Sequence, residues 1–268
     1  MNGYRSVVRD KQFEHYKDGP TFKDRLSRKN ISNTITIVLF LIAQWFFVHL
    51  VALLTAFKTQ QYYESGWITL LDFMMIFSIV SILYYALIER ASLGFSRLQP
   101  QFCSIYDDYY WKHERYWKFT ENPYLNLFSG MPLKGFIWRL YGVKVGKKLF
   151  DDGVGIPERT LVSIGDHCTI NQMVILQSHS LENGTFKSDH IHIGNDCTIG
   201  WNAFVHYGVK MEDNVALDAD SFLMKGEHLT QNSTWRGNPA REVQDPLSTE
   251  VNCVPENSQQ HLAQRRHG

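Results

Sequence analysis

Histidines are the residues of this 268-residue chain best suited to proton transfer, and several lie in its C-terminal half. Histidine titrates near neutral pH, so it can accept a proton from an attacking amine or hydroxyl group. His179 ends a short aliphatic segment just before a polar stretch, and it is the candidate general base. Glu182 is a candidate for orienting that imidazole through its second nitrogen, and equally a solvated loop charge.

Other candidate ligands give weaker patterns. His190 and His192 would share one face of a strand, as a metal pair would, but no third ligand stands at a suitable spacing. We therefore expect no metal ion. His206 is a candidate for lining a groove for a thioester donor, and equally a surface residue. The cysteines show no CxxC pair and no zinc spacing; they are Cys103, Cys168, Cys197 and Cys253.

A six-residue period positions these side chains. It runs from Val162 to His179, stops for eleven residues, and resumes from Ile191 to Gly226, giving nine hexads. The third position of each hexad is aliphatic or Met: Ile164, Ile170, Leu176, Ile193, Ile199, Val205, Met211, Leu217 and Leu223. The first position is small or β-branched, and it includes Cys168 and Cys197.

Positions one and three of an extended segment face the same way, so each hexad predicts one flat strand followed by a turn. Three such strands make one coil of a parallel β-helix whose interior is a stack of aliphatic side chains. We expect about four coils over residues 143–241, with Cys168 and Cys197 as interior residues. Glycine and asparagine at positions four and six fit tight corners.

The closing stretch resembles the hexapeptide-repeat O-acetyltransferases of the maltose and galactoside type. The resemblance covers residues 193–241 and includes the ending GNPAR at Gly237–Arg241. It implies a left-handed β-helix, trimers with a groove between subunits, and an acetyl-CoA donor. This chain departs from the pattern at Lys225-Gly226, where those enzymes have Lys-Asp.

A longer resemblance, over residues 31–243, is to the C-terminal region of poly-lysine synthetase-like non-ribosomal peptide synthetases. The segments RASLGFSRLQPQFCSIYD, YWKHERYWK, ERTLVSIGD and SHSLENGTFKSDHIHIG carry it. It implies amide formation from a thioester held on a phosphopantetheine carrier protein or on CoA, with His179 as the base. Residues that would grip the donor are His206, Lys225, Trp235, Asn238 and Arg241.

Two other functions stay open. One is a CoA-dependent O-acetyltransferase acting on an envelope sugar, and the other is a silent membrane scaffold for a peptide synthetase complex. The adenylation and carrier domains of a full synthetase are missing here, so we expect a fragment, or a protein that works with such partners in trans. The balance of 27 basic and 27 acidic residues argues against nucleic acid as a partner.

Two apolar runs predict a membrane anchor over residues 31–89. Residues 35–57 carry no charge, residues 67–88 carry only Asp72, and a loop of about nine residues joins them. Basic residues before the first run and after the second place both ends, and the β-helix, in the cytoplasm by the positive-inside rule. We expect a multi-pass protein of the cell membrane.

The flanking segments differ in composition. Residues 1–30 are polar and basic, and residues 242–268 are polar, as in a disordered tail. Residues 90–142 are rich in Tyr, Trp and Phe mixed with basic residues. This composition fits helices at the level of the lipid headgroups, or a helical collar packed on the β-helix.

Overall fold

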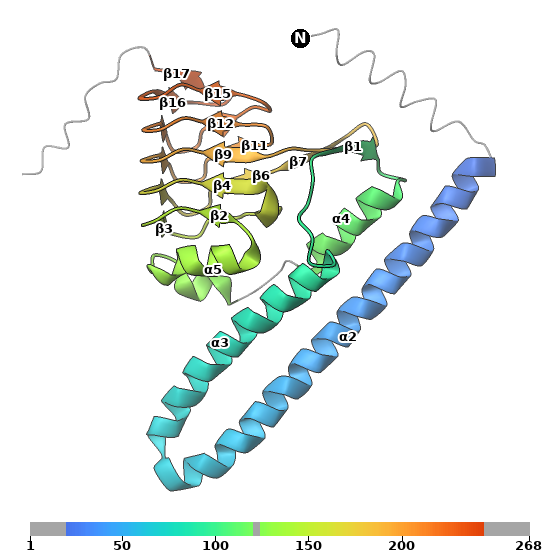
Figure 1. Ribbon diagram of the computed structural model, residues 1–268, viewed down its shortest axis with the longest axis vertical. Helices are drawn as coiled ribbons and strands as arrows, with labels where there is room; N and C mark the ends of the chain where they lie inside the picture. The colour runs from blue at the N-terminus through green and yellow to red at the C-terminus, as the bar shows by residue number, and fades with distance from the viewer. Residues whose placement is uncertain (1–19, 120–123, 244–268) are drawn as a thin grey trace, which may run out of the picture.

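The computed structural model describes residues 20–119 and 124–243. It consists of a long helical hairpin, a layer of short helices, and a parallel β-helix that stands on that layer (Figure 1). The tail was predicted from residue 242, but Glu242 belongs to a strand. Residues 244–268 of the predicted tail, and residues 1–19, lie outside the described residues.

The hairpin is formed by α2 (Pro20–Ser65) and α3 (Trp67–Ser92). Both are long and apolar enough to cross a membrane. Most of their apolar surface is exposed, which is unlike the core helix of a soluble protein. The chain is therefore associated with membrane through these two helices.

The prediction of a nine-residue loop between the two spans is wrong. Helix α2 continues to Ser65, and the chain reverses at Gly66 alone, which has a φ of 60°. A left-handed φ suits glycine, because it has no Cβ to clash. Lys58, predicted in the loop, forms an ion pair with Asp72 across the hairpin. The pair explains how the one acidic residue of the second run is accommodated.

The β-helix has three flat faces of parallel strands. The first stacks β2 (Lys144–Val145), β4 (Val162–Ile164), β9 (Ile191–Ile193), β12 (Lys210–Met211) and β15 (His228–Leu229). The second stacks β3 (Phe150–Asp151), β5 (Thr169–Ile170), β10 (Thr198–Ile199), β13 (Ala216–Leu217) and β16 (Thr234–Arg236), and β17 (Arg241–Glu242) pairs antiparallel with β16. The third stacks β6 (Ile175–Gln177), β11 (Phe204–His206) and β14 (Phe222–Leu223). We call them faces one, two and three.

The interior confirms the hexad prediction. Ile170, Ile199 and Leu217 lie in register on neighbouring strands of face two and are at most 1% exposed. The other third-position side chains are buried in the same core, as are Cys168 and Cys197. The six-residue count also continues beyond the nine predicted hexads, because Leu229 occupies the next inward position.

Two corner positions differ in what they require. The sixth residue of many hexads has a positive φ, including Asn202, Asn214 and Asp220. The fourth-position glycines have ordinary φ but no room: a Cβ on Gly194 would lie 2.6 Å from Asp213 Oδ1. Glycine at position four is therefore needed for the close approach of adjacent coils, whereas the positive φ falls at position six.

A layer of short helices lies between the hairpin and the β-helix. Helix α4 (Asp108–Phe119) packs against both α2 and α3, and α5 (Leu133–Tyr141) closes the first coil, where Trp138 Nε1 donates to Asp151 Oδ2 over 2.6 Å. The 3₁₀ turn η1 (Leu125–Phe128) precedes α5. Helix α5 thus contacts the β-helix, and α4 contacts the hairpin.

The interruption after His179 is a β-hairpin. Strand β7 (His179–Glu182) pairs antiparallel with β8 (Thr185–Ser188), and β8 pairs in turn with β1 (Gln101–Ser104), which follows α3. Figure 1 shows this three-stranded sheet reaching from the coil toward α4. The excursion closes at its base, where the Asp189 amide donates to the Ser178 carbonyl over 3.1 Å.

Candidate functional site

The structure places His179 beside a buried carboxylate. Its Nδ1 lies 2.7 Å from Oε1 of Glu158, whose side chain is fully buried, whereas the His179 side chain is 16% exposed. Glu158 precedes the 3₁₀ turn η2 (Arg159–Leu161), which leads into β4. The contact is close in distance, but its angle is not that of a hydrogen bond. A proton carried on Nδ1 would face the carboxylate and would leave Nε2 as the proton acceptor.

Glu158 is held by three further groups. Trp117 Nε1 donates to Oε1 over 2.6 Å, and the Ser178 amide donates to Oε2 over 3.0 Å. His113 Nε2 lies 3.6 Å from Oε1. Trp117 and His113 both come from α4, so the helical layer completes the surroundings of the carboxylate.

The surroundings keep Glu158 ionised. Burial alone would raise the pKa of this carboxyl group, but the contacts with His113 and His179 outweigh it and lower the pKa to about 2. Burial lowers the pKa of His113, although Glu158 acts in the opposite direction. A neutral His113 beside an ionised Glu158 is the state expected near pH 7.

Aromatic rings fix the orientation of the His179 imidazole. Its centroid lies 4.6 Å from the Trp117 ring and 6.0 Å from the Phe186 ring, which is stacked at 27°. Phe186, on β8, is fully buried. His179 therefore sits at the start of the β-hairpin with a defined ring plane and limited contact with solvent.

Glu182 was considered as the carboxylate that orients His179, but the structure pairs it with other residues. Its carboxylate forms ion pairs with Lys225 and, at 3.4 Å, with Lys187. It therefore links the β-hairpin to the coil, and the carboxylate beside His179 is that of Glu158. Lys225, a candidate donor contact, is the coil partner in this link and also lies over the Tyr207 ring.

His206 lies on face three, one coil beyond the strand that leads to His179. It is in register with Gln177 on face three, and its Nδ1 is buried with no hydrogen-bond partner among residues 20–119 and 124–243. Burial lowers the pKa of this imidazole, and His179 contributes to the shift. A neutral ring with an open nitrogen can form one hydrogen bond to a bound group.

Face three is the apolar one. Its outward residues at position two are Ile175, Phe204 and Phe222, and the two phenyl rings stack with centroids 5.0 Å apart and planes at 7°. The outward residues of face one are Lys144, Ser163, His192, Lys210 and His228. Face three therefore offers an apolar surface that leads from the coil's far end to His179.

The remaining predicted donor contacts lie toward the last coil. Trp235 is in register with Leu217 and packs against the interior, with Nε1 donating to Ser233 Oγ over 2.9 Å. Asn238 and Arg241 are exposed, and the chain between them lies beside β14, since the Ala240 amide donates to the Phe222 carbonyl over 2.9 Å. Asn238 therefore lies near the far end of face three, whereas Arg241, on β17, is paired with Arg236 of face two.

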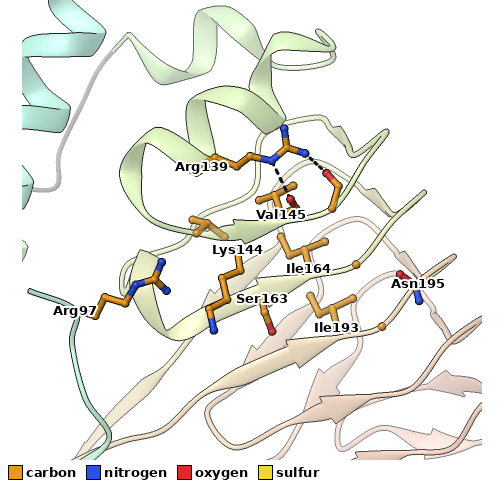
Figure 2. Close-up of a pocket in the computed structure, with 12 residues that line it drawn as sticks. Arg97, Arg139, Lys144, Val145, Ser163, Ile164, Ile193 and Asn195 are labelled. Atoms are coloured by element: carbon orange, nitrogen blue, oxygen red, sulfur yellow. Dashed lines mark hydrogen bonds between the residues drawn. The ribbon is translucent and has the colours of Figure 1, made fainter.

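A hollow lies away from His179. It has a volume of about 630 Å³ and lies along face one, and Arg97, Lys144 and Ser163 are among its lining residues (Figure 2). Arg139 of α5 borders it, with Nε donating to the Val145 carbonyl over 2.9 Å. None of the proposed catalytic residues lines this hollow. Within the described ranges no group of three His, Cys, Asp or Glu side chains is placed to hold a metal ion.

Sequence reasoning missed Glu158, His113 and Trp117. All three stand within the segments ERTLVSIGD and YWKHERYWK that carry the longer resemblance. Their proximity to His179 depends on the pitch of the coil and on the docking of α4, and neither follows from local spacing.

Two known proteins are similar in sequence to part of this chain. Over 181 residues the chain is 28% identical to a delta-poly-L-ornithine synthetase of Acinetobacter baumannii, a match that covers 66% of this chain and 13% of that protein. It is 27% identical over 142 residues to an Escherichia coli protein assigned as an acetyltransferase of colanic acid biosynthesis, covering 44% of this chain and 77% of that protein. No family model matches. The chain carries a hexapeptide-repeat acyltransferase region.

Two solved structures of acetyltransferases align with part of this chain. A maltose O-acetyltransferase from Clostridium difficile aligns with a TM-score of 0.40 and 17% identity, over 58% of this chain and 95% of its own. A hexapeptide-repeat acetyltransferase from Vibrio cholerae, complexed with acetyl-CoA, aligns with a TM-score of 0.38 and 19% identity, over 45% of this chain and 82% of its own.

Proposed function

We propose that this protein is a membrane-bound acyltransferase that transfers an aminoacyl group from a thioester to an amine in the synthesis of a poly-amino acid. The observation that carries the proposal is the contact between His179 Nδ1 and the buried Glu158 carboxylate, at 2.7 Å. Its location, at the point where the β-hairpin leaves the coil and beside the apolar face three, supports a site that is accessible to a substrate.

In the proposed reaction His179 Nε2 accepts a proton from the attacking amine as nitrogen forms its bond to the thioester carbonyl carbon. The carbon–sulfur bond then breaks, and the leaving thiolate takes the proton from the imidazolium to become a thiol. Glu158 stays ionised throughout because its pKa is about 2. It orients the ring and stabilises the imidazolium, without itself contacting the substrate.

The donor is proposed to lie along face three. Its pantetheine arm would run over Phe204 and Phe222 toward His179, with His206 Nδ1 free to bond to a donor group. Asn238 and Arg241 would contact the carrier protein or the CoA nucleotide at the far end. We propose that a second copy covers this face within a homotrimer, as the apolar surface favours.

The choice of an amine acceptor rests on the poly-ornithine synthetase relative. The match covers 13% of that protein. We propose that an adenylation and carrier unit supplies the activated amino acid. Basic segments flanking the two apolar runs support cytoplasmic placement of the β-helix and of both ends of the hairpin.

The test uses purified full-length protein, a carrier protein loaded with L-ornithine as its thioester, and free L-ornithine. The wild-type protein is expected to form dipeptide, measured by mass spectrometry. The variant His179→Ala is expected to lose about two to four orders of magnitude of the rate, the usual contribution of general base catalysis.

The matched control is His192→Ala. His192 is an exposed histidine on face one, with Nδ1 2.7 Å from Ser163 Oγ, and it is remote from the proposed site. Its substitution is expected to leave the rate unchanged. Equal activity of His179→Ala and the wild type would overturn the catalytic proposal and favour a silent scaffold.

The similarity to the colanic acid acetyltransferase supports a second candidate, O-acetylation of an envelope sugar with acetyl-CoA. The two candidates share the base and differ in donor and acceptor. Saturable binding of acetyl-CoA together with acetylation of a sugar hydroxyl would favour the second. Formation of dipeptide from the loaded carrier would favour the first.

A further inference from the structure

A second exposed apolar surface lies at the base of the β-helix, remote from face three. It is formed by η1, the turn that follows it, and α5. Its members are 48–63% exposed, and we call them the basal patch: Leu127, Met131, Leu133 and Phe136.

Helix α5 is apolar on two sides. Its inner side buries Ile137, Trp138 and Tyr141 against the first coil. Its outer side presents Leu133 and Phe136, three residues apart and therefore on one face of the helix. A helix that is apolar nearly all round needs a second apolar environment in addition to the protein core.

The charged residues within 125–141 are all basic. Two acidic residues adjoin this segment from β3 and the turn after it: Asp151 is buried against Trp138, and Asp152 is exposed. The Lys134 ammonium is turned into the protein, where it donates to the Leu125 carbonyl over 2.6 Å, and Arg139 turns toward the Val145 carbonyl. Arg97 also faces the adjoining hollow (Figure 2). Apolar side chains bordered by cations are typical of a surface that binds anionic lipid.

The hairpin fixes the level of the basal patch relative to the two spans. The Tyr141 hydroxyl donates to the Ile82 carbonyl over 3.3 Å, and the Tyr124 ring lies 5.3 Å from Phe77 and 6.4 Å from Phe47. These partners lie within the apolar stretches of α2 and α3. The helical layer is therefore attached partway along the spans and not at their ends.

The length of hairpin beyond this attachment is short. Ile82 to Trp67 is a separation of 15 residues, which is about 22 Å of helix at 1.5 Å per residue. Phe47 to Ser65 is 18 residues, or about 27 Å. Both fall below the roughly 30 Å of a hydrocarbon core, and a tilt reduces them further. A hairpin that crosses the bilayer must therefore bring the helical layer down to it.

We infer that the basal patch is immersed in the lipid interface, so that the β-helix rests on the bilayer through α5 and is not held away from it. The inference rests on the proposed membrane crossing of the hairpin. Phe136 and Leu133 enter the region of the acyl chains, and Arg97 and Lys144 lie near the headgroups. The partner is an anionic phospholipid bilayer.

The test measures the depth of single labels in the full-length protein. In a background with Cys103→Ser and Cys253→Ser, the substitution Phe136→Cys carries a polarity-sensitive fluorophore. The protein is reconstituted into vesicles of phosphatidylcholine and phosphatidylglycerol that contain nitroxide-labelled lipids. The Phe136 label is expected to be quenched several-fold more by lipid nitroxide than by aqueous iodide.

Two matched labels define the scale. Met75→Cys marks the exposed side of α3 and is expected to report lipid, whereas Trp201→Cys marks an exposed apolar position on the β-helix and is expected to report water. All three variants must keep the wild-type thermal transition. A Phe136 label in water together with a Met75 label in lipid would overturn this inference but leave the membrane crossing standing.

Both labels in water would overturn the inference together with the membrane crossing. Neither result bears on acyl transfer by His179, which is assayed separately. Repeating the measurement in pure phosphatidylcholine tests the role of charge. The Phe136 label is expected to become shallower there, and an unchanged depth would overturn the assignment of Arg97 and Lys144 to the headgroups.

Discussion

At the scale of single residues, the proposed site pairs a histidine with a carboxylate from the preceding coil. His179 was proposed from its corner position and the resemblance. Glu158 was not, because it lies 21 residues earlier and becomes a neighbour only through the turn of the coil. The nearby Glu182 looked equivalent in sequence, but it points to Lys225. A repeating coil makes residues about eighteen apart adjacent, so local spacing misidentifies partners.

The substitution Glu158→Gln removes the anion and keeps the size of the side chain. We expect kcat to fall roughly 10- to 1,000-fold with KM little changed, because the imidazolium formed in the reaction loses its stabilising charge. Steady-state kinetics with the loaded carrier measures both constants. Glu158→Asp is expected to recover part of kcat. A rise in KM with normal kcat would contradict a positioning role.

The same carboxyl group predicts a dependence of stability on pH. Its folded pKa of about 2 lies below the ordinary value of 4.5, so it stabilises the folded state above pH 4.5, and this contribution is lost as the pH falls toward 2. Thermal unfolding in detergent between pH 3 and pH 7 measures the effect. The difference in Tm between the wild type and Glu158→Gln should shrink as the pH falls. A difference that grows on acidification would contradict the assignment.

At the scale of elements, the hexads predicted the interior of the coil almost residue by residue. That success has a simple physical basis: inward and outward positions alternate along each strand, so the first-position and third-position side chains both point into the coil. The structure added what periodicity does not show. The corner glycines are set by the approach of the next coil, and the polar interruption forms a β-hairpin that pairs with β1.

The corner packing predicts a contrast between two glycines. Gly194→Ala places a Cβ 2.6 Å from Asp213 Oδ1 and 2.7 Å from the carbonyl carbon of Glu212, so the coils must separate. We expect a loss of about 1–3 kcal/mol in the free energy of unfolding, as for overpacking in a core. Chemical denaturation of the protein in micelles measures it.

The control for that substitution is Gly155→Ala. Its nearest contact would be Val174 O at 3.7 Å, an ordinary van der Waals distance. Its stability should stay within about 0.5 kcal/mol of the wild type, or rise slightly through the loss of glycine's freedom in the unfolded chain. Equal destabilisation by both substitutions would show that close approach is not the cause.

At the scale of the whole molecule, the sequence predicted two apolar spans and a β-helix but not their connection. The connection is a buried ion pair between Glu89 of α3 and Arg159, the residue after Glu158. Both residues are at most 5% exposed, and the Arg159 guanidinium lies 4.4 Å from the Tyr141 ring centroid. Burial lowers the pKa of Arg159 to about 9. Contacts of this kind depend on docking and leave no periodic signal in the sequence.

We expect Glu89→Gln to destabilise the folded protein by about 3–5 kcal/mol, because Arg159 would be left as a buried charge without its counterion. Chemical denaturation in micelles measures the loss. The control is Glu64→Gln, on an exposed position near the end of α2, which should leave stability unchanged. A Glu89→Gln protein as stable as the wild type would show that Arg159 finds another partner.

The hydrogen bond that joins Ser178 to Asp189 has a consequence for how such a protein can diversify. Residues added to the coil itself in any number other than a multiple of eighteen would turn every later strand onto a different face. Residues added between Ser178 and Asp189 leave each later strand of the coil on its present face. The β-hairpin that begins at His179 is thus the segment where added residues leave the register of the later coils unchanged.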